Sequence, residues 1–215
     1  EIKQENKVRQ ALIEITELLR AERVPIPALE YFIVQLVIAD CLQDPASLYR
    51  EYHTLYEELD QRVKTGIAAP GIRENPLRVY YSGMPTQEFQ IWNIIEDTGG
   101  MLVGCDSYLT LFREQVPENG SPLEALAKWI WKMPHQLPTS RRIEAVVPFM
   151  KRQGAEVVIL NNNIGCRNLS EADTLAKDLI KDELGVPVIS IETRFPLENI
   201  EAVESRIKTF IEINR

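Results

Sequence analysis

Cysteine and histidine are scarce in this chain of 215 residues, which holds three cysteines and two histidines. Cys41, Cys105 and Cys166 are odd in number and far apart, so they do not describe a disulfide framework, and we expect reduced thiols. No CxxC pair occurs, and His53 and His135 lie far from the cysteines in the sequence. A zinc site built by this chain alone is therefore not expected.

Basic charge and long apolar runs are lacking as well. The chain has 24 Lys and Arg against 32 Asp and Glu, a formal net charge of −8 and a pI near 5.0. This balance argues against a nucleic-acid partner, which would need a clustered basic face. No apolar stretch reaches the length of a membrane span, and the first residues lack the apolar core of a signal peptide. We therefore expect a cytoplasmic protein with no membrane partner.

Nucleotide and hydrolase motifs are missing too. The sequence has no Walker loop and no GxGxxG, so neither ATP hydrolysis nor dinucleotide binding is predicted. What is present is ordinary: 45% hydrophobic and 26% charged residues are typical of a globular protein with one sizeable core or two small ones. The chain begins without methionine, inside a predicted helix, which indicates a fragment or a processed or partly ordered subunit.

The first 70 residues are predicted to be helical. Apolar positions from Val8 to Leu19 recur at helical spacing, and the prolines of Val24-Pro-Ile-Pro27 end this first helix. A second helix, from Ala28 to about Leu42, is apolar on most sides, which indicates burial. Asp44-Pro45 starts a third helix, which runs toward Gly66.

From residue 71 to residue 215, strands are predicted to alternate with helices. The predicted strands are 77–81, 101–104, 156–160 and 187–191, and the predicted helices are 88–98, 121–132, 138–153, 170–184 and 200–213. Alternation of this kind implies parallel pairing, because each crossover returns the chain to the same edge. We predict an α/β fold, in which a helical segment (1–70) precedes a Rossmann-like or flavodoxin-like domain (71–215) with a four-stranded parallel sheet and flanking helices.

Polar and thiol side chains follow the predicted strands where ligands bind in open α/β sheets, beyond the carboxyl ends. They are Ser82-Gly83, Cys105-Asp106, Asn161 to Cys166, and Glu192-Thr193-Arg194. Of these, Cys166 is the foremost candidate, because it lies between a strand and a predicted helix that opens at Ser170. The helix start favours a thiolate.

Each candidate also has an ordinary structural explanation. Cys166 could be a small buried apolar residue, as free cysteine often is. Ser82 and Gly83 could allow close approach of a ligand to the backbone, or form a plain turn. Asn163 offers amide groups at the rim, but asparagine is common in loops. Arg167 could stabilise a thiolate or bind a phosphate, or form a surface ion pair.

Several segments together resemble the large subunits of the 2-hydroxyacyl-CoA dehydratase and benzoyl-CoA reductase family. The segments that carry the resemblance are Leu48-Tyr-Arg50, Glu58-Leu59, Leu77-Arg-Val-Tyr-Tyr-Ser-Gly-Met-Pro85, Glu96-Asp-Thr-Gly-Gly-Met-Leu-Val103, Pro122-Leu-Glu-Ala-Leu-Ala127, Cys166-Arg167 with Ser170, Gly185-Val-Pro-Val-Ile-Ser-Ile-Glu192 and Arg206-Ile-Lys-Thr-Phe-Ile-Glu212. Each segment is weak alone. Their order and spacing over nearly the whole chain are far more specific.

The resemblance implies an iron-sulfur enzyme that uses one-electron, radical chemistry on a CoA thioester. In this family, paired homologous subunits each hold a 4Fe-4S cluster through cysteines, and an ATP-hydrolysing activator supplies the electron. By this resemblance Cys166 is a cluster ligand, with Arg167, Ser82, Gly83 and Asn163 as further cofactor-binding candidates. Thiolates are the usual ligands of such clusters.

The chain also departs from the family pattern. It resembles only the C-terminal part of such a subunit, so the remaining cluster cysteines would lie outside it, and we expect the isolated chain to be inactive. Cys105 matches no cluster position, and the carboxylate that many relatives show after the last strand is not obvious. These residues do not separate dehydration of a 2-hydroxyacyl-CoA from reduction of an aromatic acyl-CoA. A non-catalytic relative that serves binding or assembly is the alternative.

Overall fold

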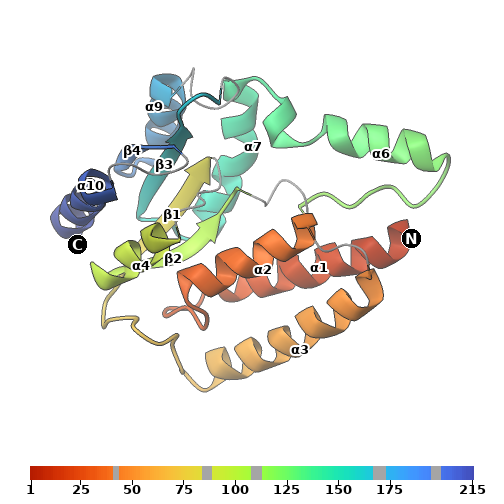
Figure 1. Cartoon of the computed structure of the whole chain (residues 1–215), viewed down its shortest axis with the longest axis horizontal. Coiled ribbons are helices and arrows are strands. Elements are labelled where there is room, and N and C mark those ends of the chain that lie inside the picture. The colour runs from red at the N-terminus through yellow and green to blue at the C-terminus, as the bar shows by residue number, and fades with distance from the viewer. Residues whose placement is uncertain (41–43, 84–88, 108–112, 167–172, 195–199) are drawn as a thin grey trace.

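The structure is a computed structural model, and it describes all residues except 41–43, 84–88, 108–112, 167–172 and 195–199. Three helices come first: α1 (Ile2–Leu18), α2 (Ala28–Asp40) and α3 (Pro45–Lys64). The start of α3 is the predicted one, with Pro45 in the first turn and the Asp44 carboxylate accepting a hydrogen bond from the Ser47 N–H at 3.1 Å. Figure 1 shows α1 running alongside α2 and α3 below the sheet.

The sheet has four strands, β1 (Leu77–Gly83), β2 (Gly100–Cys105), β3 (Val157–Asn163) and β4 (Val188–Thr193). All of their pairings are parallel, and their order is β2-β1-β3-β4. This confirms the predicted α/β class, and the order is the flavodoxin-like one. The chain leaves β1 for β2 on one side and then crosses to β3 on the other, so the switch point lies between β1 and β3.

Helices cover both faces of the sheet (Figure 1). On one face, α7 (Thr139–Arg152) and α9 (Asp173–Leu184) bury alternate side chains such as Tyr80, Val158 and Leu160. On the other, α1, α2, α4 (Gln90–Asp97) and α10 (Ile200–Asn214) bury Tyr81 and Ile159. The near-continuous apolar strands are typical of a parallel sheet covered on both sides.

The helical segment shares its apolar cluster with the second face of the sheet. Val8, Leu12 and Ile15 of α1 are fully buried in the same cluster as Val79 of β1 and Ile211 of α10. The division of the chain into domains 1–70 and 71–215 stays a prediction. None of the helices in the described residues is long and apolar enough to cross a bilayer.

The strands β1 and β3 extend further than the apolar pattern predicts. Ser82 and Gly83, predicted as a turn, belong to β1, where Gly83 pairs with Asn161. The three asparagines 161–163, predicted as a loop, belong to β3, and Asn163 pairs with Thr193 of β4. Backbone hydrogen bonds continue where the side chains turn polar, and a hydrophobic pattern does not register such pairing. The predicted start of a helix at Ser170 lies outside the described residues.

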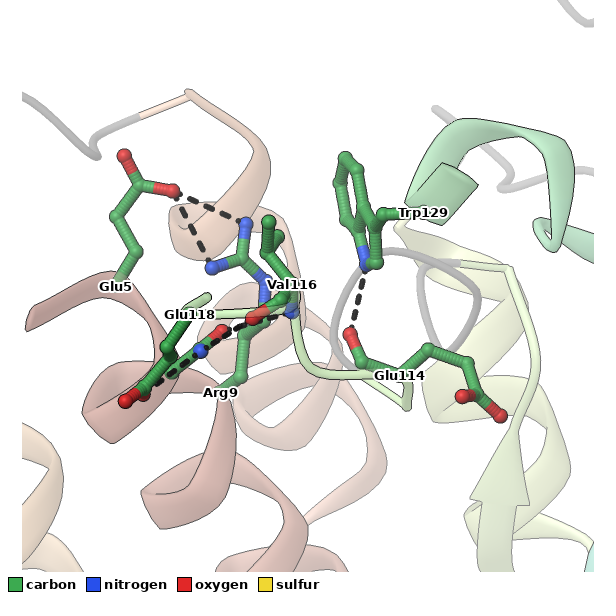
Figure 2. A network of polar contacts seen from close by, with 7 residues as sticks. Glu5, Arg9, Glu114, Val116, Glu118 and Trp129 are labelled. Atoms are coloured by element: carbon green, nitrogen blue, oxygen red, sulfur yellow. Dashed lines mark hydrogen bonds and ion pairs between the residues drawn. The ribbon is translucent and has the colours of Figure 1, made fainter. Parts of the chain in front are cut away.

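A further helix, α6 (Pro122–Trp131), stands away from the sheet and is followed by the short 3₁₀ helix η1 (Pro134–Gln136) (Figure 1). Figure 2 shows how α6 is attached: the guanidinium of Arg9 in α1 lies 4.8 Å from the Trp129 ring centre and also hydrogen-bonds Glu5. The Trp129 Nε1–H donates to the Glu114 carbonyl at 2.7 Å. Aromatic and polar contacts thus hold one side of α6 against α1.

Candidate functional site

The carboxyl ends of the strands bring the candidate residues together above the β1/β3 switch point. Gly83 ends β1 with φ +104°, and a Cβ there would lie 2.4 Å from the Asn161 carbonyl oxygen. Only glycine fits this close approach of two strands. The group that approaches Gly83 in the structure is the backbone of β3, and the close approach of a ligand to Gly83 stays a prediction.

Asp106, directly after β2, is the centre of a buried polar cluster. Its carboxylate accepts hydrogen bonds from the Ser82 hydroxyl at 2.7 Å and from the Gly83 N–H at 2.8 Å. Burial raises the pKa of Asp106 to about 6, although the bonds from Ser82 and Gly83 and the positive charge of Arg142 act in the opposite direction. Asp106 thus fastens the end of β2 to the end of β1.

Cys105 is a structural thiol. Its Sγ–H donates to the Ser107 hydroxyl at 3.1 Å, and Ser107 donates to the Gly83 carbonyl, also at 3.1 Å. Burial raises the pKa of Cys105 to about 12, so the sulfur stays protonated near neutral pH. A metal ligand has to be a thiolate, and Cys105 is therefore unsuited to that role.

Cys166 differs from Cys105 in each respect. It lies beyond β3, is only partly buried, and forms no disulfide. Its backbone N–H donates to the Asn163 carbonyl at 3.0 Å, which ties the residue to the last position of β3. The guanidinium of Arg142 in α7 interacts electrostatically with both Cys166 and Asp106. Cys166 is thus a partly exposed sulfur within reach of the positive charge of Arg142.

Arg142 itself is buried, with 6% of its surface exposed, and its Nη2 atom has no hydrogen-bond partner among the described residues. Burial lowers the pKa of Arg142, while the charges of Asp106 and Cys166 raise it. No ion pair within 4.0 Å joins the described side chains of Arg142 and Asp106, and the two Asp106 oxygens accept hydrogen bonds from Ser82 and Gly83 instead. The cluster therefore contains a cationic donor that its neighbours do not fully use.

The asparagines of β3 point to opposite faces of the sheet. Asn161 accepts a hydrogen bond from the Thr193 hydroxyl at 2.9 Å, which closes the β3/β4 end. The Asn162 Nδ2 lies 3.5 Å from the Ser190 hydroxyl, and Ser190 donates to Asp173 at the start of α9. The Asn162 Oδ1 is buried without a partner among the described residues.

The predicted site residues are thus partly assembled. Ser82, Gly83, Asn163 and Cys166 all lie at the carboxyl rim, whereas Arg167 lies outside the described residues. Their roles as cofactor ligands stay predictions. Sequence reasoning named Asp106 only as a strand end and missed Ser107 and Arg142. The polar pair after the strand was a usable signal for Asp106 and Ser107, but nothing in the sequence singled out Arg142.

A metal site is not complete in the described part of the chain, where no three His, Cys, Asp or Glu side chains converge. A cavity of about 680 Å³ lies at the opposite edge of the sheet and is lined by residues such as Glu22, Arg23, Glu74 and Arg78. Acids and bases balance there, and Arg78 is already bonded to backbone carbonyls. The rim cluster remains the better candidate, because parallel sheets bind ligands at their carboxyl edge.

A family model described as "2-hydroxyglutaryl-CoA dehydratase, D-component" matches residues 1–214. The chain belongs to this dehydratase family. The resemblance to 2-hydroxyacyl-CoA dehydratases is thereby confirmed, whereas benzoyl-CoA reduction stays a prediction. A comparison with curated proteins gave no match.

Proposed function

We propose that the chain is part of an iron-sulfur 2-hydroxyacyl-CoA dehydratase in which Cys166 supplies one ligand of a 4Fe-4S cluster. The observation that carries the proposal is the position of Cys166: a partly exposed sulfur beside Arg142 at the ligand-binding edge, in a chain of the D-component family. A four-iron cluster ordinarily takes several thiolates. Cysteines outside this segment would complete the ligand set.

The described residues fit one corner of such a site. The Cys166 backbone is tied to the end of β3 by its hydrogen bond to Asn163, and the guanidinium of Arg142 would offset the negative charge of a cluster ligand there. When bound, the cluster would supply the one-electron chemistry that removal of a 2-hydroxyl group from a CoA thioester requires. The role of this chain is to hold the sulfur at the end of β3. That strand end is fixed by the pairing of Asn161 with Gly83, whose N–H in turn donates to Asp106.

The proposed partners are a paired homologous subunit, an ATP-hydrolysing activator and the acyl-CoA substrate. Support for a subunit contact comes from α6, which leaves Leu123, Ile130 and Trp131 exposed. Apolar side chains grouped on one exposed helix are typical of interaction surfaces. Trp131→Ser should weaken co-purification with the paired subunit and leave folding intact, since this side chain is exposed.

Anaerobic reconstitution with iron and sulfide tests the cluster assignment. The protein to use is the complete parent chain with its paired subunit, as wild type, Cys166→Ser and Cys105→Ser. Iron content and the low-temperature EPR signal of the reduced protein should fall in Cys166→Ser and stay near wild type in Cys105→Ser, whose sulfur is buried and protonated. Equal iron in all three proteins would reject Cys166 as a ligand.

One observation favours a second candidate, a non-catalytic assembly domain. Within the described residues only one thiol is suited to iron, and no group of three potential ligands exists. If cysteines from elsewhere do not reach Cys166, the fold would still present α6 and the rim to a partner. Retained assembly with the paired subunit, but no iron in any preparation, is the result that this alternative predicts.

A further inference from the structure

We propose that Arg142 forms a binding site for an anionic oxygen group, a carboxylate or a phosphate, above the β1/β3 switch point. The inference concerns the chain's own side chains and does not require a cluster. It goes beyond the proposed function, which assigns no ligand to Arg142.

The first support is an unused donor. Arg142 has 6% of its surface exposed, yet its Nη2 atom has no partner among the described residues. A buried guanidinium N–H without an acceptor is costly, so such groups are normally paired or face a ligand. The guanidinium is a preferred recognition group for carboxylate and phosphate oxygens.

The second support is that the nearest carboxylate is committed elsewhere. Asp106 accepts from Ser82 and from the Gly83 N–H, and it is not within ion-pair distance of Arg142. Asp106 therefore moderates the positive charge of Arg142 at longer range without occupying its Nη2. An internal ion pair, the usual explanation for a buried arginine, is absent between these two described residues.

The third support is a second unpartnered atom on the same side of the sheet. Asn162 points to the α7 and α9 face, where its Nδ2 approaches Ser190, and its Oδ1 is buried without a partner among the described residues. An unused donor and an unused acceptor thus lie at the carboxyl edge of the sheet, where open α/β sheets bind ligands. A ligand with an anionic oxygen for Arg142 and a hydroxyl group for Asn162, such as a hydroxy acid or a singly protonated phosphate ester, would match both.

Thermal unfolding of the purified chain in the presence of simple anions tests the site. Acetate and inorganic phosphate are titrated against sodium chloride at equal ionic strength. For a site with a Kd of about 1 mM, an anion at about 100 mM is at about 100 times its Kd. Binding at that concentration should raise Tm by several degrees. The wild type should show a saturable shift, and Arg142→Gln should lose at least tenfold in anion affinity.

Arg141→Gln is the matched control. Arg141 is the adjacent residue of α7, is exposed and pairs with Glu144 at the surface. Its variant should titrate like the wild type. Equal anion responses in Arg142→Gln and Arg141→Gln, or no wild-type response beyond that to chloride, would overturn the proposal.

A second measurement uses the wild-type protein alone, in case Arg142→Gln does not fold. Alkylation of Cys166 by the anion iodoacetate is compared with alkylation by neutral iodoacetamide, with the modified peptide quantified by mass spectrometry. Arg142 should favour iodoacetate, and a bound anion should abolish that preference in a saturable way. A rate ratio that no anion changes would contradict the site.

The same assay separates the two sources of the anion. Competition by acetate or a short hydroxy acid, but not by phosphate, places the acyl end of a substrate at Arg142. Competition by phosphate and free coenzyme A, but not by acetate, places a nucleotide phosphate there. Either result supports the anion site, and both are independent of iron, so a failed cluster assignment leaves them unaffected.

Discussion

Asn6 and Val116 form a reciprocal pair across 110 positions of sequence. The Asn6 Nδ2 donates to the Val116 carbonyl at 2.8 Å, and the Val116 N–H donates to the Asn6 Oδ1 at 2.9 Å. Asn6 also donates to the Glu118 carboxylate at 3.1 Å. The amide side chain of Asn6 thus satisfies both backbone groups of Val116, as a neighbouring strand would. It holds the segment that leads into α6 against α1.

Asn6→Ala should destabilise the fold by about 2–4 kcal/mol, since it leaves a buried N–H and a buried carbonyl of Val116 without partners. Urea denaturation measures the loss, and hydrogen exchange should show the Val116 amide losing protection. Lys7→Ala, an exposed position of the same helix, is the control and should change stability by less than about 0.5 kcal/mol. Equal losses in the two variants would show that the pair is not significant.

Gly83→Ala should be severely destabilising for a steric reason. The new Cβ would meet the Asn161 carbonyl at 2.4 Å and would also force φ +104° on a residue with a side chain, at a cost of more than about 3 kcal/mol. Gly120→Ala separates the two effects, because Gly120 has φ +90° but nothing within 4 Å. That control should lose only about 1–2 kcal/mol. Similar decreases in Tm would show that backbone strain alone explains both.

The alternation of sequence periods predicted the α/β class and each element of the parallel sheet, because apolar runs such as Val157 to Leu160 are unmistakable in sequence. Strand order was not predictable to the same degree. The choice of β1, rather than β2, as the neighbour of β3 depends on side-chain packing between distant segments, which local periodicity does not encode. The polar ends of β1 and β3 were missed for the same reason, since their pairing resides in the backbone.

For the candidate site, the limit of sequence-based prediction is clearest at Arg141 and Arg142. In sequence the two residues are an ordinary basic pair on a predicted helix. Consecutive helix positions point about 100° apart, so α7 turns one guanidinium into the rim cluster and the other to solvent. Which one faces inward is fixed by how Ile143 and Val147 dock on the sheet. Cys166, by contrast, was predictable because its position after a strand is visible in sequence.

Arg78 should be a major contributor to stability at the opposite edge of the sheet. Its guanidinium donates to four backbone carbonyls, at 2.7–3.2 Å, of Leu19, Ala21, Gln153 and Gly154. It thereby closes the C-terminal ends of α1 and α7, where carbonyls lack helical partners. Arg78→Met should cost about 3–5 kcal/mol by denaturant titration, and Arg78→Lys should recover only part of this, because an ammonium does not span four acceptors.

Arg20→Met is the comparison for Arg78. Arg20 is exposed and forms a surface ion pair with Glu17, so its loss should cost less than about 1 kcal/mol. If Arg78→Met unfolded at the same denaturant concentration as Arg20→Met, the carbonyl contacts would contribute nothing beyond a surface charge.

Glu96 should make stability depend on pH near neutrality. It lies in α4 and accepts a hydrogen bond from the Ala28 N–H at 2.8 Å, at the start of α2. Burial raises its pKa to about 7 from an ordinary value of 4.5, while the bond from Ala28 acts to lower it. Between pH 4.5 and 7 the folded state therefore keeps a proton on Glu96 that the unfolded state releases. The contribution of Glu96 to the free energy of unfolding is thus full below pH 4.5 and is lost as pH rises through 7.

Glu96→Gln keeps an acceptor for Ala28 without a charge. The free energy of unfolding of this variant, relative to the wild type, should rise between pH 5 and pH 8 and level off above. Glu57→Gln, which removes an exposed carboxylate from α3, should give a smaller change over the same range. Parallel stability curves for Glu96→Gln and wild type from pH 5 to pH 8 would mean that Glu96 is already ionised in the folded protein at pH 5, and that the Ala28 N–H outweighs burial.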